Sequence, residues 1–210
     1  MKRVLYVRQD NNGDVLLQGP AIRAIATRSE VTLLCGPRGV PAARVLPGVA
    51  DVFVNEAAWI DAEPQQVHRD SVDAFVDDII ARRFDEAVIS TSFHQDPLPV
   101  ALLLRMAGVA RIGAISVDYP GSLLDVRHHV DEDIHEVVRA LSLAHAMGYE
   151  VAGDDPMRMQ IVPLPRERIA PFSSYVVVHP GATVPARAWS PDRNKDLVAR
   201  LARDGYNVIV

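Results

Sequence analysis

The sequence alternates short, almost unbroken apolar runs with longer amphipathic stretches. The main runs are Val4–Val7, Val31–Cys35, Ala87–Ser90 and Ala110–Ile115. Apolar runs without polar alternation are typical of strands that are buried on both faces. The clearest amphipathic stretch places one set of apolar residues at helical spacing: Val72, Phe75, Val76, Ile79 and Ile80. Strands that alternate with helices predict an α/β fold, in which a parallel sheet carries helices on both faces.

Composition and charge narrow the class of protein. The 210 residues are 49% hydrophobic and 23% charged, which is typical of a globular protein. A net charge of −5 offers no dominant basic surface, so nucleic acid is not an expected partner. The single cysteine, Cys35, cannot pair within the chain and suits a reducing cytoplasm. The apolar run after Arg3 is too short for a signal peptide and no run is long enough to span a membrane, although a peripheral membrane contact stays open.

The chain changes character at residues 151–174, which are rich in proline. We interpret residues 1–150 as an N-terminal Rossmann-like domain and residues 151–174 as a linker with one short strand at Met157–Ile161. Residues 175–210 predict strand, loop, helix and strand, with Ser190 as the helix N-cap and Pro191 at the first helical position. One such unit cannot bury its own faces. We therefore expect the chain to be a fragment that holds only the beginning of a second Rossmann-like domain.

The first candidate site follows the run Val4–Val7. Ligands of open α/β sheets bind beyond the carboxyl ends of the strands. Gly13 permits close backbone approach or a positive φ, and Asp14 lies at the start of the next predicted helix. A helix N-terminus stabilises a carboxylate as the anion, and a carboxylate that faces a cleft can act as a general base. The alternative is that Asp14 only caps the helix.

The second candidate site joins the predicted strand Tyr175–His179 to the helix that begins at Ser190. Gly181 leaves backbone N–H groups accessible, Thr183 offers a hydroxyl, and Arg187 offers a planar cation. These groups are the components of a phosphate site. The alternative is an ordinary surface loop that contains one arginine.

Other polar residues are weaker evidence for a binding or metal site. His94 follows the run Ala87–Ser90, where it could hydrogen-bond an acceptor or be an ordinary loop histidine. The acids of Asp131–Asp133 precede a predicted helix, where acids complement the helix dipole, so we do not interpret them as a metal motif. His128, His129 and His135 lack the spacing of zinc ligands. We therefore predict no metal site.

Taken together, the two candidate sites and their neighbouring strands resemble glycosyltransferase family 9, the heptosyltransferase family. The segments that carry the resemblance are Val4–Arg8, Asn12–Leu16, Pro20–Ala24, Val31–Pro37, His179–Ala182 and Arg187–Pro191. The resemblance extends over essentially the whole chain and over the first part of a typical family member. It implies a GT-B fold, in which two Rossmann-like domains face each other across a cleft. The first domain of such a protein binds the acceptor, and the second binds the nucleotide-sugar.

The resemblance also implies roles for individual residues. It places the catalytic base at Asp14, which would deprotonate the acceptor hydroxyl. We expect three residues on the acceptor side: Asn12, Gly13 and His94. The donor-phosphate contacts are expected at Gly181, Ala182, Thr183 and Arg187. Many members carry lysine where this chain has Arg187, so the cation is kept and its geometry differs.

The implied activity is an inverting, metal-independent transfer of a sugar. The expected donor is a nucleotide diphosphate sugar, ADP-heptose, and no cofactor is expected. The expected acceptor is a hydroxyl of a glycan or glycolipid, as in lipopolysaccharide core synthesis. We expect a cytoplasmic protein, and a position at the inner face of the cell membrane stays open.

Two other functions remain open on the sequence alone. The chain could be a catalytically incompetent fragment or a non-enzymatic α/β binding domain. A nicotinamide-dependent oxidoreductase is disfavoured, because no Gly-x-Gly-x-x-Gly follows any predicted strand. A thermal-shift comparison of nucleotide diphosphates with nicotinamide cofactors would separate the transferase from the oxidoreductase.

Overall fold

The computed structural model describes residues 1–61, 64–92, 94–131, 133–151, 153, 157–163, 172–182 and 185–210. The chain divides into two compact units, Met1–Val162 and Pro163–Val210. We call them the first and the second unit, and each is described by itself.

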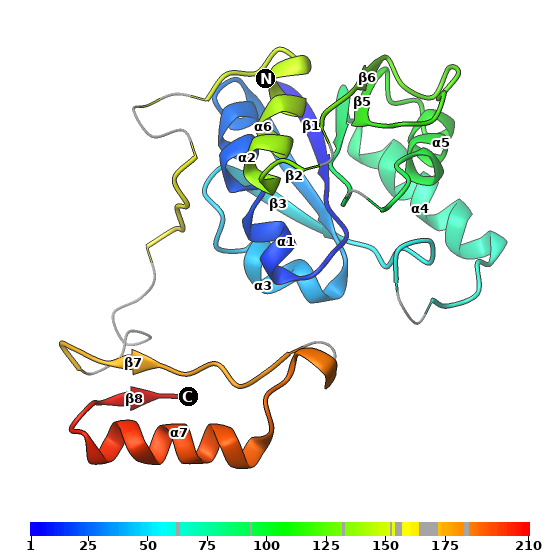
Figure 1. Ribbon diagram of the computed structural model, residues 1–210. Coiled ribbons are helices and arrows are strands. Elements are labelled where there is room, and N and C mark those ends of the chain that lie inside the picture. Colours follow the sequence, from blue (N-terminus) through cyan, green and yellow to red (C-terminus); the bar gives the residue numbers. More distant parts are fainter. Residues whose placement is uncertain are drawn as a thin grey trace. The chain divides into compact units, whose positions relative to one another are not determined.

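The first unit is built on a six-stranded, fully parallel sheet (Figure 1). Its strands are β1 (Lys2–Val7), β2 (Ser29–Cys35), β3 (Val49–Val54), β4 (Glu86–Ile89), β5 (Arg111–Ile115) and β6 (Val126–His128). Their order in the sheet is β3-β2-β1-β4-β5-β6. The predicted α/β class is therefore confirmed, and so is the interior position of β1, β2 and β4. The sequence pattern did not indicate β6, because this three-residue edge strand is only partly buried and includes Arg127 and His128.

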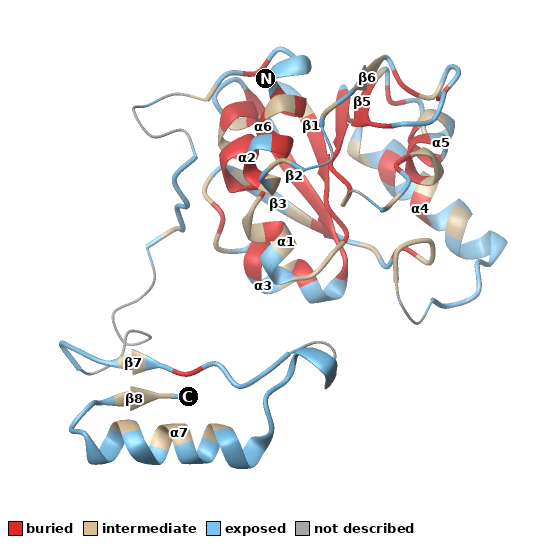
Figure 2. Ribbon diagram, in the orientation of Figure 1, coloured by how far each residue is buried: buried red, intermediate tan, exposed pale blue. Residues whose placement is uncertain are grey.

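Helices cover both faces of this sheet, as the alternating pattern predicts. The helices are α1 (Asn12–Leu16), α2 (Gly19–Ala26), α3 (Val40–Ala43), α4 (Arg69–Arg82), α5 (Leu98–Met106) and α6 (Glu136–Ala146). Val4 and Tyr6 of β1 pack into one core cluster with residues of α2 and α6, while Leu5 packs into a second cluster with residues of α4 and α5. Figure 2 shows that the buried residues concentrate in the sheet and on the helix faces that contact it. Each large apolar side chain removed from water contributes about 1.5–3 kcal/mol.

The helical segment after β1 is interrupted. Helix α1 ends at Leu16 and α2 begins at Gly19. Pro20 explains the break, because its ring clashes with the carbonyl four residues earlier and it has no N–H to donate. The interruption leaves α1 as a separate short helix at the carboxyl end of β1.

The short strand expected at Met157–Ile161 is absent. These residues have no regular secondary structure, and the N–H of Val162 donates to the carbonyl of Val45 at 2.8 Å. Proline and glycine in this region limit regular pairing, since proline removes a ladder donor.

The second unit contains β7 (Val176–Val177), a 3₁₀ turn at Pro185–Arg187, helix α7 (Pro191–Arg203) and β8 (Val208–Ile209). The two strands pair in parallel. The predicted helix start is confirmed: the Ser190 hydroxyl accepts from the N–H of Arg193 at 3.3 Å, and Pro191 is the first helical residue. No residue of α7 is buried, so its apolar side chains remain accessible in this unit.

Candidate active site

The candidate catalytic site lies along the carboxyl edge of the six-stranded sheet, where five loops come together. Loops that follow parallel strands leave the sheet at the same edge, which is where open α/β folds bind ligands. These loops begin at Arg8 after β1, Gly36 after β2, Asn55 after β3, Ser90 after β4 and Ser116 after β5.

Asp14 occupies the first turn of α1, behind the N-cap residue Asn11. Its Oδ1 lies 3.5 Å from Nη2 of Arg8, and its side chain is 39% exposed. The carboxylate is therefore held on one side by a cation and is open to a ligand on the other. A carboxylate in this position can accept a proton from a ligand that binds beside it. The N-cap position itself is held by Asn11, whose side chain makes no capping hydrogen bond, and Asp14 lies in the first turn of the helix.

Gly13 and Asn12, the neighbours of Asp14, have local structural roles that we did not expect from the sequence. Gly13 is helical without a positive φ, so the left-handed conformation that we allowed for is not used. A Cβ at Gly13 would meet nothing within 4 Å, which leaves open space over the backbone beside Asp14. The side-chain oxygen of Asn12 accepts from the N–H of Ala42 at 3.1 Å, so in this structure Asn12 joins α1 to α3.

Arg8 is the centre of the site, and our interpretation of the sequence missed it. Its side chain is only 1% exposed, and Nε lies 2.8 Å from Oδ2 of Asp10. Nη1 donates to Oε1 of Glu136 at 2.6 Å, and Nη2 donates to the Ser92 hydroxyl at 3.0 Å. One guanidinium thus connects the loops after β1 and β4 with the start of α6. The sequence feature that could have identified Arg8 is a charged residue placed directly after an apolar parallel strand.

A buried network of hydrogen bonds through Gln18 holds α1 in position. The side-chain amide of Gln18 donates to the carbonyl of Asp14 at 2.9 Å. Gln18 Oε1 in turn accepts from the hydroxyls of Tyr6 and Ser90, both at 2.8 Å. Burial, together with the charge of Glu136, raises the pKa of Tyr6 against the effects of Ser90 and Arg8, so its hydroxyl stays a donor. The orientation of α1, and with it the position of Asp14, depends on these bonds.

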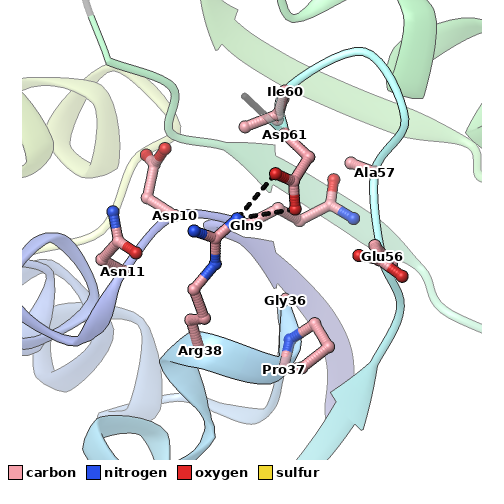
Figure 3. A pocket seen from close by; sticks show the side chains of 10 residues that line it. All are labelled: Gln9, Asp10, Asn11, Gly36, Pro37, Arg38, Glu56, Ala57, Ile60 and Asp61. Atoms are coloured by element: carbon pink, nitrogen blue, oxygen red, sulfur yellow. Dashed lines mark hydrogen bonds and ion pairs between the residues drawn. The ribbon is translucent and has the colours of Figure 1, made fainter. Parts of the chain in front are cut away.

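A polar pocket of about 130 Å³ opens beside this cluster (Figure 3). Gln9, Asp10 and Asn11 line it from the loop after β1. Across the pocket, Nη2 of Arg38 contacts both carboxylate oxygens of Asp61, at 2.7 and 2.6 Å. Carboxylate and amide groups in such a pocket can hydrogen-bond the hydroxyls of a bound molecule.

His94 lines a different pocket, of about 220 Å³, together with Arg139 and Ser116. The structure does not place it in the pocket of Figure 3, and its side chain is exposed. Among the described residues no group of three His, Cys, Asp or Glu side chains could hold a metal ion. No helix in the described part of the chain has the length and apolar character needed to cross a bilayer.

The predicted phosphate site lies in the second unit. Gly181 and Arg187 line one pocket of about 510 Å³, which β7 and α7 also line and which includes Trp189. Ala182 lines an adjoining apolar pocket that Gly181 and Trp189 share. Gly181, Ala182 and Arg187 are exposed, and Thr183 lies outside the described residues. The structure thus brings Gly181 and Arg187 to one pocket.

Solved structures with the same architecture include two heptosyltransferases and a family 9 glycosyl transferase. The E. coli heptosyltransferase WaaC with ADP matches with a TM-score of 0.69 and 18% identity, over 98% of this chain and 66% of that one. E. coli ADP-heptose LPS heptosyltransferase II gives 0.70 and 15%, over 99% and 63% of the two chains. The family 9 glycosyl transferase of Veillonella parvula DSM 2008 gives 0.72 and 13%, over 99% and 62%. The chain therefore spans about two thirds of the length of these proteins and shares their fold.

Sequence comparison gives the family. No curated protein sequence matches the chain. The family model described as glycosyltransferase family 9 (heptosyltransferase) matches residues 78–210, which is more than half of the chain. That match includes the loop after β4, all of α6 and the predicted phosphate loop. The chain belongs to glycosyltransferase family 9.

Proposed function

We propose that the whole protein transfers a sugar from a nucleotide diphosphate sugar to a hydroxyl of a glycan or glycolipid acceptor. Family membership supports the reaction class. The observation that carries the proposal is the carboxylate of Asp14, which is 39% exposed and held beside the buried Arg8 at the carboxyl edge of the sheet.

In the proposed reaction, Asp14 accepts the proton of the acceptor hydroxyl. The resulting oxygen nucleophile forms a bond to the anomeric carbon while the bond from that carbon to the diphosphate oxygen breaks. The nucleotide diphosphate leaves with the electron pair. Because one displacement occurs from the face opposite the leaving group, the anomeric configuration inverts. A positioned base of this kind contributes about 10²–10⁴ in rate.

The proposed role of the second unit is to bind the leaving diphosphate. Arg187 supplies a cation and Gly181 leaves a backbone N–H accessible in the same pocket. These groups can offset the charge that develops on the phosphate oxygen, which is the work that a divalent metal does in other transferases. The proposed mechanism is therefore metal-independent.

ADP-heptose is the donor we propose, and a cytoplasmic lipopolysaccharide precursor is the proposed acceptor class. Support comes from two structures of one solved relative, E. coli heptosyltransferase WaaC, one with ADP and one with ADP-2-deoxy-2-fluoro heptose.

Mass-spectrometric detection of sugar transfer tests the proposal. The natural full-length protein is incubated with a panel of nucleotide-sugars, including ADP-heptose, and with glycan and glycolipid acceptors. We expect one product whose mass increases by one sugar residue and whose formation persists in EDTA. No transfer from any donor, by a protein that is folded and binds nucleotide, would contradict the proposal.

A further inference from the structure

Three carboxylates share the single positive charge of Arg8. Nη1 of Arg8 lies 2.6 Å from Oε1 of Glu136, and Nε lies 2.8 Å from Oδ2 of Asp10. The contact with Asp14 is the longest of the three, at 3.5 Å from Nη2. Arg8 is only 1% exposed, so water screens these interactions weakly. Because one carboxylate balances one guanidinium, two of the three negative charges are in excess.

Glu136 reaches this cluster from a different part of the fold. Asp10 lies in the loop after β1 and Asp14 in α1, whereas Glu136 lies in the first turn of α6. A helix N-terminus favours an anion, so the negative charge of Glu136 is stabilised there. Burial lowers the pKa of Arg139, the charge of Glu136 raises it, and the charge of Arg8 lowers it. The carboxylate of Glu136 therefore acts on two guanidinium groups.

The hydrogen bonds of the two strongest partners of Arg8 differ. Asp10 also accepts from the hydroxyl of Ser92 and from the side-chain amide of Gln95, so it joins the loops after β1 and β4. Among the described residues, Arg8 alone donates a hydrogen bond to the side chain of Glu136. Asp10 thus has a clear structural role, while the main effect of Glu136 is on the charge of Arg8.

The position of Arg8 does not depend on the charge of Glu136 alone. Nη1 also donates to the carbonyl of Ser90 at 3.3 Å, and Nη2 donates to the Ser92 hydroxyl at 3.0 Å. A glutamine at position 136 would still offer a side-chain oxygen to Nη1. Such a change removes the charge and keeps the hydrogen-bond acceptor.

Other titratable groups near the cluster carry no further negative charge. Burial raises the pKa of Tyr6, so its hydroxyl stays neutral. His135 is the exposed N-cap residue of α6, and its Nδ1 accepts from the N–H of Val137 at 3.2 Å. The loop after β4 contacts the cluster through the uncharged side chains of Ser92 and Gln95.

The strength of Asp14 as a base depends on how much of the charge of Arg8 acts on it. A cation beside a carboxylate makes it a weaker base, and a nearby anion has the opposite effect. Asp14 is 39% exposed, against 25% for Glu136 and 10% for Asp10, so it is the carboxylate most accessible to a ligand. The charge of Glu136 offsets part of the field of the guanidinium at Asp14.

We propose that Glu136 is a positioning residue that takes up the charge of Arg8, so that Asp14 stays oriented by Arg8 and still accepts a proton readily. The role of Asp14 as the base rests on the proposed function. The coupling between Glu136 and Asp14 is a property of the cluster itself, and it can be measured without turnover.

Carbon-13 NMR of the Asp14 carboxyl group measures this coupling in the natural full-length protein. The resonance is assigned by its absence in Asp14→Asn and is followed as a function of pH. In Glu136→Gln the midpoint of the Asp14 titration should move to lower pH by about 0.5–1 unit, less than the effect of a charge in direct contact. Glu136→Asp keeps the charge and should restore the wild-type midpoint. Glu30→Gln removes an exposed carboxylate and should leave the midpoint unchanged.

Kinetics measure the consequence for the reaction. A weaker base slows proton transfer without removing a contact to the acceptor, so Glu136→Gln should lower kcat about three- to tenfold. The KM for the acceptor should stay near that of the wild type. The acid limb of the pH–rate profile should move to lower pH together with the NMR midpoint, and Glu136→Asp should recover both.

Stability separates this role from a purely structural one. Urea unfolding of Glu136→Gln should be close to that of the wild type, because Arg8 keeps its hydrogen bonds and two carboxylates. A variant that unfolds readily would show that Glu136 has a structural role and would overturn the proposal. An Asp14 midpoint that stays constant or rises in Glu136→Gln would overturn it too, as would an equal shift in Glu30→Gln.

The two proposals fail in different ways. If the Asp14 midpoint moves in Glu136→Gln while no sugar is transferred from any donor, the proposed function fails and the coupling stands. If sugar transfer depends on Asp14 but its midpoint does not respond to Glu136→Gln, only this inference fails.

Discussion

Arg8 and Glu136 are 128 residues apart in the sequence, yet Nη1 of Arg8 donates to Oε1 of Glu136 at 2.6 Å. The contact joins the end of the first strand to the start of α6. Since Arg8 also pairs with Asp10 and Asp14, it neutralises several carboxylates that would otherwise repel one another at the edge of the sheet.

Replacing Arg8 by methionine should destabilise the protein strongly. The change leaves Asp10 and Glu136 without their counter-ion in a largely buried site, which costs about 3–5 kcal/mol. Denaturant unfolding of the full-length protein measures this loss. Arg3→Met is the control, because the pair of Arg3 with Glu30 is solvent-exposed and should cost at most about 1 kcal/mol. Similar losses in the two variants would show that the Arg8 cluster contributes nothing beyond a surface pair.

Asp14→Asn should remove catalysis and leave the fold intact. The amide keeps the shape of the side chain but cannot accept the acceptor proton, so turnover should fall at least about a hundredfold. Unfolding stability and nucleotide-sugar binding should stay near those of the wild type. Asp77→Asn, at an exposed position of α4, should keep full turnover. If Asp14→Asn unfolds readily and retains its specific activity, Asp14 has only a structural role.

Arg187→Ala should weaken donor binding selectively. If the guanidinium contacts a diphosphate, its loss should cost about 1.5–3 kcal/mol of donor binding, the range for a hydrogen bond to a charged group. Acceptor binding should be largely unaffected. Calorimetric titration with the donor measures the effect, and Arg200→Ala, an exposed position of α7 that lines no pocket described above, is the control. An unchanged donor dissociation constant would exclude Arg187 from the site.

Glu86 should make the stability of the first unit sensitive to acid. Burial raises its pKa, but the bonds from Lys2 and Tyr149 and the charge of Arg111 outweigh burial and hold the pKa below the ordinary value of 4.5. Since the pKa is lower in the folded state, the stabilisation is present above pH 4.5 and is lost as pH falls through the folded-state pKa.

The unfolding free energy should therefore fall more steeply below pH 4.5 in the wild type than in Glu86→Gln. Urea unfolding at a series of pH values measures both slopes. Glu30→Gln, which removes an exposed carboxylate, should keep the wild-type slope. Parallel curves for wild type and Glu86→Gln would contradict the assignment.

The sequence predicts the framework of this protein better than its site, for physical reasons. Strands such as β1 are identified by local apolar character, and the start of α7 is identified by Ser190 and Pro191, so both follow from neighbouring residues. The ion pairs of Arg8 with Asp14 and Glu136 depend on contacts that local sequence patterns do not indicate. The burial of Arg139 was missed because periodicity alone assigns an arginine of a predicted helix to the solvent face. The position of Asp14 at a helix start could be predicted because strand, glycine and helix start lie together, while its catalytic role stays a prediction.

The break between α1 and α2, before Gly19, could also have been predicted from the sequence. Pro20 predicts a helix break on steric grounds, yet the apolar residues around it continue the helical pattern. The edge strand β6 could not be predicted from its own residues. They are only partly buried and include arginine and histidine, so the strand conformation is decided by pairing with β5.

The central place of β1 also constrains how the first unit acquires its structure. Val4 pairs with Val31 on one side and with Glu86 on the other. During synthesis β1 therefore gains its second neighbour, β4, only after all of α4 has been made. Such non-local pairing closes long loops, which makes folding slow and leaves an unpaired apolar strand edge in the interim. Expression at low temperature, where chain elongation is slow, should therefore favour soluble protein over aggregates.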